Sequence, residues 1–238
     1  MFQPGAVLPS GGVESVVIDG GPLTPNEVIR VARMGAQVEL AGSLGERMHP
    51  ARQLVEDAVA SGETVYGITT GFGALATTHI GREDSEILQY NLIRSHATGV
   101  GDPMPDDVVR AMLLLRARTL AQGHSGVRPV VVERLITMLN RNILPLVPGQ
   151  GSVGASGDLA PFAHMALPII GEGFVRVDGE VKPTSATDLE PLRLKTKEGL
   201  ALLNGTEGMT AMGVLALHRA RHLVGVADVA CALSVEAL

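Results

Sequence analysis

The sequence contains very few aromatic residues and almost no cysteine. Aromatic side chains make up 3% of its 238 residues, and tryptophan is absent. A core built from this composition must be aliphatic, made of Leu, Val, Ile, Ala and Met. The single cysteine, Cys231, excludes an internal disulfide, which fits a reducing compartment. Cys231 falls in an apolar stretch, where we expect it to be a small buried core residue.

The chain also lacks a strong positive charge and a long hydrophobic run. Its net charge of -6 provides no broad basic field for nucleic acid or anionic lipid. No charged segment followed by an apolar one marks a signal peptide. The apolar runs are shorter than the ~18 residues that cross a bilayer. We therefore expect a globular cytoplasmic protein with no membrane or nucleic-acid partner.

Helical periodicity and capping signals dominate what is present. Thr24-Pro25-Asn26-Glu27 predicts a helix start, with a capping box and proline at the first helical position. Further helices are predicted at 48–60, 84–95, 106–121, 128–142, 158–167 and 209–238. Short strands are predicted at 16–19 and 37–40, and Asp178-Gly179 predicts a hairpin over 174–181. The expected fold is mainly α-helical with minor β hairpins.

The glycine-rich loop, residues 149–158, stands apart from these elements and reads Gly-Gln-Gly-Ser-Val-Gly-Ala-Ser-Gly-Asp. Its composition alone favours a tight turn and a helix cap. A phosphate-binding loop would need a lysine that is absent. A hydrolase nucleophile elbow would need glycine where Asp158 stands.

Internal cyclisation is the chemical alternative for this loop. The Gly157 nitrogen can attack the Ala155 carbonyl if the turn brings the two together. Glycine is required at 157 because a Cβ there would block the approach. Loss of water from that ring and from the Ser156 side chain leaves an exocyclic methylidene. The product is an electrophile made from the chain itself. Asp158 can assist the proton transfers or cap the helix that follows.

Four ordered blocks resemble the aromatic amino acid ammonia-lyases, above all the histidine ammonia-lyases. The first is Gly154-Ala155-Ser156-Gly157-Asp158-Leu159-Ala160-Pro161, which resembles the family signature. The others are 66–73, with Thr69 where asparagine is common, 89–101 and 198–206. The resemblance covers essentially the whole chain but only the N-terminal half of a family member.

The resemblance implies a prosthetic group, 4-methylidene-imidazol-5-one, formed from Ala155, Ser156 and Gly157. It implies that Gly154 and Asp158 support this group, and that neither an external cofactor nor a catalytic metal is needed.

The resemblance also assigns residues that act on the substrate. Tyr66 becomes the catalytic base that removes the β-proton. Because a free tyrosine has a pKa of about 10, cationic neighbours or helix N-termini would have to stabilise its phenolate. Ser95, His96 and Asn204 become substrate-binding residues. The pair Ser95-His96 points to L-histidine, whereas His-Leu or Phe-Leu there would point to tyrosine or phenylalanine.

The reaction implied is elimination of ammonia from L-histidine to give trans-urocanate, the first step of histidine degradation. The fold implied is the N-terminal portion of an ammonia-lyase/fumarase-like helical fold. Residues 1–208 would form the domain that carries the loop, and 209–238 the start of the central helical bundle of a homotetramer. Because the chain ends within a helical pattern that has no stop signal, we expect a truncated protein with little or no activity alone.

Two alternatives stay open: a tyrosine or phenylalanine ammonia-lyase or aminomutase, and a non-catalytic helical module that keeps the motif without cyclising. His218 and His222 have metal-ligand spacing on one helix face. Because no third ligand is evident, we interpret them as part of a solvated basic face. Glu207 stands where many family members have glutamine, and the sequence assigns it no role.

Overall fold

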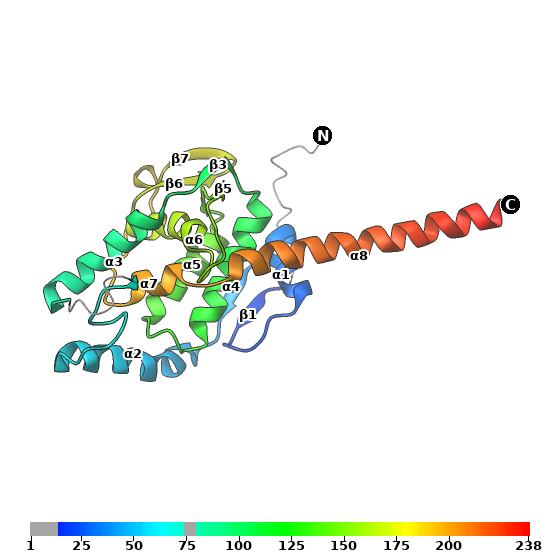
Figure 1. Ribbon diagram of the computed structural model, residues 1–238. Helices are drawn as coiled ribbons and strands as arrows, with labels where there is room; N and C mark the ends of the chain where they lie inside the picture. The colour runs from blue at the N-terminus through cyan, green and yellow to red at the C-terminus, as the bar shows by residue number, and fades with distance from the viewer. Residues whose placement is uncertain (1–13, 74–79) are drawn as a thin grey trace.

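The computed structural model describes residues 14–73 and 80–238 and confirms a mainly helical fold (Figure 1). At its centre lies α4 (Asp106–Ala121), as predicted from the sequence. It packs against α1 (Pro25–Met34), α5 (Pro129–Asn140) and the start of α8 (Glu207–Glu236). Its side chains are buried on nearly every face, as expected for a helix in the middle of a core.

The first unit of the fold is a strand, a helix and a parallel strand. β1 (Val16–Ile18) pairs in parallel with β2 (Val38–Leu40), and α1 connects them. The capping box is confirmed, because the Thr24 hydroxyl accepts from the Glu27 N–H at 3.3 Å and the Glu27 carboxylate accepts from the Thr24 N–H at 2.7 Å. Gly35 ends the helix in the left-handed conformation, with φ 71°.

The remaining helices are α2 (Leu44–Ser61), α3 (Arg82–His96), α6 (Leu159–Ala166) and α7 (Glu198–Leu203), with 3₁₀ turns η2 (Leu167–Ile170) and η3 (Thr184–Ala186). Of these four helices, α2 packs on α4 and α5, and the other three pack mainly on one another. The predicted helix at 48–60 begins earlier, at Leu44. The helix predicted to end at Leu167 passes there into η2, because Pro168 has no N–H to continue the α-helical ladder.

The predicted hairpin is confirmed as β6 (Phe174–Val177) and β7 (Glu180–Pro183). Asp178 and Gly179 both have positive φ, as an Asp-Gly hairpin turn requires. Three strands were not predicted: β4 (Leu144–Pro145), which pairs with β6, and the antiparallel pair β3 (Val100–Pro103) and β5 (Pro148–Gln150). They are too short to carry a pattern of their own.

The long helix α8 starts inside the body and then extends away from it (Figure 1). Its buried residues lie in the first turns, and the part beyond Leu215 is exposed, including His218 and His222. The prediction that Cys231 is a core residue is therefore wrong, since this cysteine lies on the exposed part of α8. The division of the chain at 208/209 stays a prediction.

By length and composition, Glu198–Glu236 is apolar enough to cross a bilayer. This is weak support for a membrane helix, because core helices of soluble proteins pass the same test and this one begins in the packed body. The expectation of no membrane partner stays a prediction.

Candidate functional site

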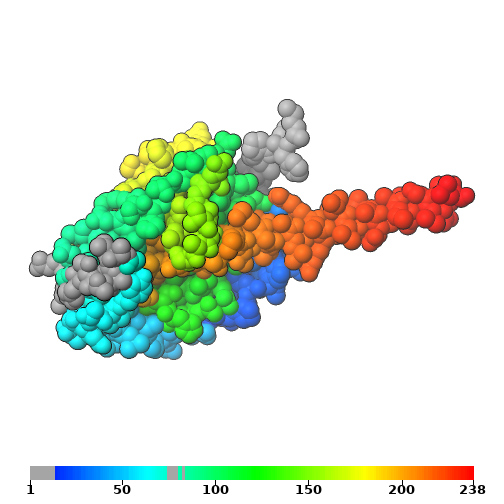
Figure 2. All heavy atoms as spheres, viewed as in Figure 1, coloured from blue at the N-terminus to red at the C-terminus, as the bar shows by residue number. Residues whose placement is uncertain are grey.

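The glycine-rich loop lies at the molecular surface. It leaves β5 at Gln150 and enters α6 at Leu159. Figure 2 shows this lime-coloured segment exposed between the green 95–105 region and the orange start of α8. Ala155 and Ser156 are exposed, whereas Gly157 and Asp158 are buried. Ser156, which would form the reactive methylidene, is thus exposed, and the residues that follow it anchor the loop in the body of the protein.

Gly157 is the most constrained position of the loop. Its φ of +144° is one that side-chain-bearing residues rarely adopt. A Cβ there would lie 2.6 Å from the Gly205 carbonyl oxygen and 2.8 Å from the Gly205 nitrogen. The next N–H, that of Asp158, donates to the same Gly205 carbonyl at 2.7 Å. The backbone therefore requires glycine at 157, as cyclisation does. Gly154 also has positive φ, but a Cβ there would meet nothing within 4 Å.

Asp158 joins the loop to α8 and is only 1% exposed. Its Oδ1 accepts from the Ser152 hydroxyl at 2.7 Å, and its Oδ2 accepts from the Met209 N–H at 2.9 Å. Of the two roles that the sequence left open for Asp158, the side-chain cap is not formed, because its carboxylate makes no cap bond in α6. It instead satisfies a first-turn N–H of α8, where a negative charge is also favoured by the helix dipole.

The predicted substrate pair lies beside the loop. The pairing of β3 with β5 sets Val100 opposite Gln150, so the end of α3 is brought to the start of the loop. His96 Nδ1 lies 2.8 Å from the Leu92 carbonyl, and the Ser95 hydroxyl donates to the same carbonyl at 3.1 Å. A carbonyl only accepts, so this contact fits the neutral tautomer in which Nδ1 of His96 carries the proton and Nε2 is an acceptor.

His164 on α6 holds the segment after α3 beside the glycine-rich loop. Sequence reasoning missed this residue. Its Nε2 accepts from the Gly99 N–H at 3.0 Å, which ties the segment after His96 to the helix that follows the loop. The side chain is half-buried, and burial lowers the pKa of its imidazole. No local pattern signals this contact, because its partners are 65 residues apart.

We expect the contact of His164 with Gly99 to contribute less to folding stability at acid pH. The lowered pKa means that the unfolded chain binds the proton first, so the stabilisation is present above about pH 6.5 and is lost as the pH falls through the folded-state pKa. His164→Gln keeps an acceptor for the Gly99 N–H and removes the titration. Urea unfolding from pH 7.5 to 5 should therefore show a smaller loss of stability in this variant. The exposed His49→Gln is the control, and an identical loss in all three proteins would contradict the assignment.

Asn204 directly follows the short helix α7, which is anchored at its start. The Gln89 Oε1 accepts from the Gly199 N–H at 3.0 Å and is buried. The Glu198 carboxylate is 0% exposed and forms an ion pair with Arg128 at 2.7 Å. These contacts fix the segment 204–205 against Gly157. Asn204 itself is exposed and directly precedes Gly205, the residue on which Gly157 packs.

Tyr66 is not brought to the loop within the described residues. It is 63% exposed, and its ring meets Phe72 at 6.2 Å between centroids. No hydrogen bond among the described residues links its hydroxyl to the glycine-rich loop. The structure therefore joins three of the four blocks around Gly157. The Tyr66 block contacts the 198–206 block, since a Cβ at Gly67 would lie 3.3 Å from a methyl group of Leu200.

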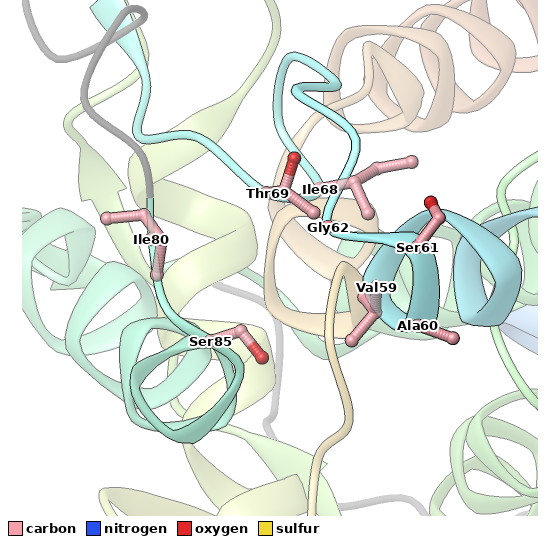
Figure 3. A pocket seen from close by; sticks show the side chains of 8 residues that line it. All are labelled: Val59, Ala60, Ser61, Gly62, Ile68, Thr69, Ile80 and Ser85. Carbon is pink, nitrogen blue, oxygen red and sulfur yellow. The ribbon is translucent and has the colours of Figure 1, made fainter.

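A pocket of about 190 Å³ lies beside that fourth block, between the end of α2, residues 68–69 and the start of α3 (Figure 3). Its lining residues are Val59, Ala60, Ser61, Gly62, Ile68, Thr69, Ile80 and Ser85. None of them is a predicted site residue, and drug-sized ligand pockets usually exceed ~300 Å³. Thr69, the departure from the family's asparagine, instead holds its own loop, since its hydroxyl accepts from the Val65 N–H at 2.8 Å.

Two further features bear on the site. Within 14–73 and 80–238, no group of three or more His, Cys, Asp or Glu residues could hold a metal ion. Glu207, to which the sequence assigned no role, is buried beneath the loop and pairs with Arg116 at 2.9 Å. Sequence reasoning missed this pair because its members are 91 positions apart.

Comparison with known proteins agrees with this arrangement. A family model described as aromatic amino acid lyase matches residues 23–238. A histidine ammonia-lyase of Gloeobacter violaceus is 52% identical over 226 residues, which are 93% of this chain and 44% of that protein. The chain thus spans less than half the length of that curated relative.

Solved structures give the same picture. The histidine ammonia-lyase of Trypanosoma cruzi has a TM-score of 0.82 at 38% identity, covering 90% of this chain and 42% of that one. A tyrosine aminomutase of Streptomyces globisporus has a TM-score of 0.81 at 41% identity, covering 87% and 39%.

Proposed function

Because the chain belongs to the aromatic amino acid lyase family, we propose that it carries the electrophile-forming half of an enzyme that eliminates ammonia from L-histidine to give trans-urocanate. One observation carries the proposal. Gly157 and Asp158 pack on Gly205, and β3–β5 pairing joins the same loop to the Ser95-His96 segment. The relatives that are named histidine ammonia-lyases support histidine as the substrate.

Ala155, Ser156 and Gly157 fit a self-formed 4-methylidene-imidazol-5-one. Only glycine is accommodated at 157, and the other two residues are exposed, so the departing water has a path out. Once formed, this group supplies an electrophile that withdraws electrons from the bound amino acid and acidifies its β-proton. No external cofactor is required. Gly154 contributes the positive φ of the turn, and Asp158 holds the loop on α8.

The other residues bind the substrate and move its proton. The free Nε2 of His96 accepts the N–H of a substrate imidazole, and the Ser95 hydroxyl helps to hold the His96 segment. The Asn204 amide lies beside Gly205, where it can hydrogen-bond the substrate. Tyr66 takes the β-proton. Because Tyr66 is exposed and its hydroxyl has no hydrogen bond to the loop among the described residues, we propose that the site is completed on assembly.

The assembly that we propose is a homotetramer in the cytoplasm, with no nucleic-acid or membrane partner. Residues 209–238 would then begin a central helical bundle. In support, the extended part of α8 exposes a series of apolar side chains that a packed partner would cover. These are Leu217, Leu223, Val224, Val226, Val229, Leu233 and Val235.

The runner-up is a tyrosine aminomutase or a related tyrosine or phenylalanine enzyme. It is favoured by the similarity to the Streptomyces globisporus tyrosine aminomutase. The pair Ser95-His96 argues against it, because an imidazole acceptor suits an imidazole donor better than a phenol or a phenyl ring.

The substrate is tested by extending this chain at residue 238 with the remaining part of the Gloeobacter violaceus relative. We expect the extended protein to form urocanate from L-histidine, measured by ultraviolet absorbance, and the 238-residue chain alone to show little or no turnover. Turnover of tyrosine or phenylalanine in place of histidine would establish the runner-up. Robust turnover by the 238-residue chain would contradict completion on assembly.

A further inference from the structure

A buried ion pair lies beneath the glycine-rich loop and connects four helices. Arg116 of α4 is 1% exposed, and Glu207, the first residue of α8, is 8% exposed. Arg116 Nη1 donates to Glu207 Oε1 at 2.9 Å, and its Nε donates to the Leu202 carbonyl of α7 at 3.2 Å. The guanidinium carbon lies 5.0 Å from the centre of the Phe162 ring of α6. One side chain therefore connects α4, α6, α7 and α8.

Stability alone does not account for this pair. Burial lowers the pKa of Arg116, and the Glu207 carboxylate opposes that shift only in part. Arg116 Nη2 and Glu207 Oε2 are buried without a hydrogen-bond partner among the described residues. Buried ion pairs can often be replaced by apolar residues of similar volume without loss of stability. A buried pair with two unsatisfied polar atoms therefore calls for a role other than stability.

The pair packs directly on the backbone of Gly205. A Cβ at Gly205 would overlap both Glu207 Oε2 and Arg116 Nη1, so the two charged groups enclose this residue. On its other side, Gly205 supports the loop. Its carbonyl accepts the Asp158 N–H at 2.7 Å and faces the position that a Cβ of Gly157 would occupy. The Gly205 peptide is thus all that separates the ion pair from the Ala155-Ser156-Gly157 segment.

Met209 continues the same support from the first turn of α8. Its N–H donates to Asp158 Oδ2 at 2.9 Å, two residues beyond Glu207. Because Glu207 begins α8, the ion pair also fixes the helix end that holds Asp158. Gly205 and Asp158 are therefore both positioned by groups that depend on Glu207.

We propose that Arg116 and Glu207 are positioning residues for the cyclisation of Ala155-Ser156-Gly157, which they direct by holding the Gly205 peptide against Gly157 and Asp158. The proposal rests on the proposed function. In the reaction, the Gly157 nitrogen bonds to the Ala155 carbonyl carbon while its proton passes to the oxygen. That oxygen leaves as water with the Ser156 amide proton. The Ser156 hydroxyl leaves as a second water with the Ser156 α-proton, so no oxidant or reductant is needed.

The main test is the double variant Arg116→Met/Glu207→Leu in the full chain. It keeps the buried volume and removes both charges, so it should fold with a similar unfolding midpoint in urea. We expect the folded double variant to lose two waters from the 150–161 peptide at least about tenfold more slowly than the unmodified chain, because misplacement by 1 Å can cost about 10²-fold in rate. Mass spectrometry over time after synthesis measures this.

Two further variants separate positioning from general stability. Glu207→Gln keeps an acceptor for Arg116 Nη1 and should lose both waters at nearly the unmodified rate. Arg110→Met removes another buried arginine of α4, whose partners are the Val31 and Leu139 carbonyls and Asn142, so it should lower the unfolding midpoint without slowing water loss.

The outcomes that overturn the proposal are distinct. Unchanged water loss in the folded double variant, beside normal loss in the unmodified chain, overturns the positioning role alone. Slowing in Arg110→Met equal to that in the double variant also overturns it, since general destabilisation would then explain both. Absence of water loss in the unmodified chain overturns the proposed function and this inference together.

Discussion

Gly157→Ala abolishes the loss of two waters from the 150–161 peptide. Its Cβ would lie 2.6 Å from the Gly205 carbonyl oxygen, at a φ of +144° that alanine rarely adopts. Either the loop must move away from Gly205 or Gly205 must leave the Arg116–Glu207 pair. In both cases the nitrogen of residue 157 no longer reaches the Ala155 carbonyl. The methyl group of the new alanine hinders its approach as well. The measurement is the fraction of this peptide that lacks two waters, determined by mass spectrometry.

Val153→Ala is the matched control for this substitution. Val153 lies in the same loop and is exposed, so its truncation should leave the water loss unchanged. Gly157→Ala chains that lose both waters as completely as the control would contradict the requirement for glycine. If neither variant lost the two waters, the loop would tolerate no substitution at all. The result would then give no support to a specific role for the Gly157–Gly205 contact.

Glu198→Ala should lower the free energy of unfolding by roughly 3 kcal/mol, because it breaks a buried ion pair and leaves backbone donors unsatisfied. The Glu198 carboxylate accepts from Nε and Nη2 of Arg128, at 2.8 and 2.7 Å. It also accepts from the backbone N–H groups of Arg128 and Lys195, at 3.0 and 2.8 Å. Its hydrogen bonds raise the pKa of Arg128. Urea unfolding of the chain and the variant measures the difference.

Glu86→Ala is the comparison for this prediction, since Glu86 pairs with Arg193 and Lys195 near the surface. Ion pairs of that kind contribute about 0–1 kcal/mol. If Glu198→Ala cost no more than Glu86→Ala, the segment that carries Asn204 would not depend on Glu198 as described. A selective loss at Glu198 would instead show that the block 198–206 is anchored from Arg128.

The sequence was sufficient for the elements that carry their own local signals. Thr24, Pro25 and Glu27 predict the start of α1, and Asp178-Gly179 predicts the β6–β7 turn, because each signal acts within four residues. The resemblance located the blocks of the site in the right order. Three of them converge around Gly157 in the structure, and the fourth, around Tyr66, contacts the 198–206 block through Gly67 and Leu200.

The features that the sequence could not supply depend on distant partners. The sequence left Asp158 with two local roles, proton transfer in the loop or capping of the next helix, and did not reveal that its carboxylate accepts from the Met209 N–H, 51 positions away. Glu207 received no role because nothing near it in the sequence identifies Arg116 as its partner. Cys231 was placed in the core from the apolar character of its helix, but burial depends on what packs against a helix, and this part of α8 has no packing partner among the described residues.

The mass of the unmodified chain tests the central claim most directly. If Ala155-Ser156-Gly157 cyclises, the purified chain is lighter than its encoded sequence by two water molecules, and the deficit maps to the 150–161 peptide. Ser156→Ala cannot form the methylidene and should lack at most one water. A chain of full encoded mass, with Ser156 intact in that peptide, would contradict the account and leave the glycine-rich loop as a turn between β5 and α6.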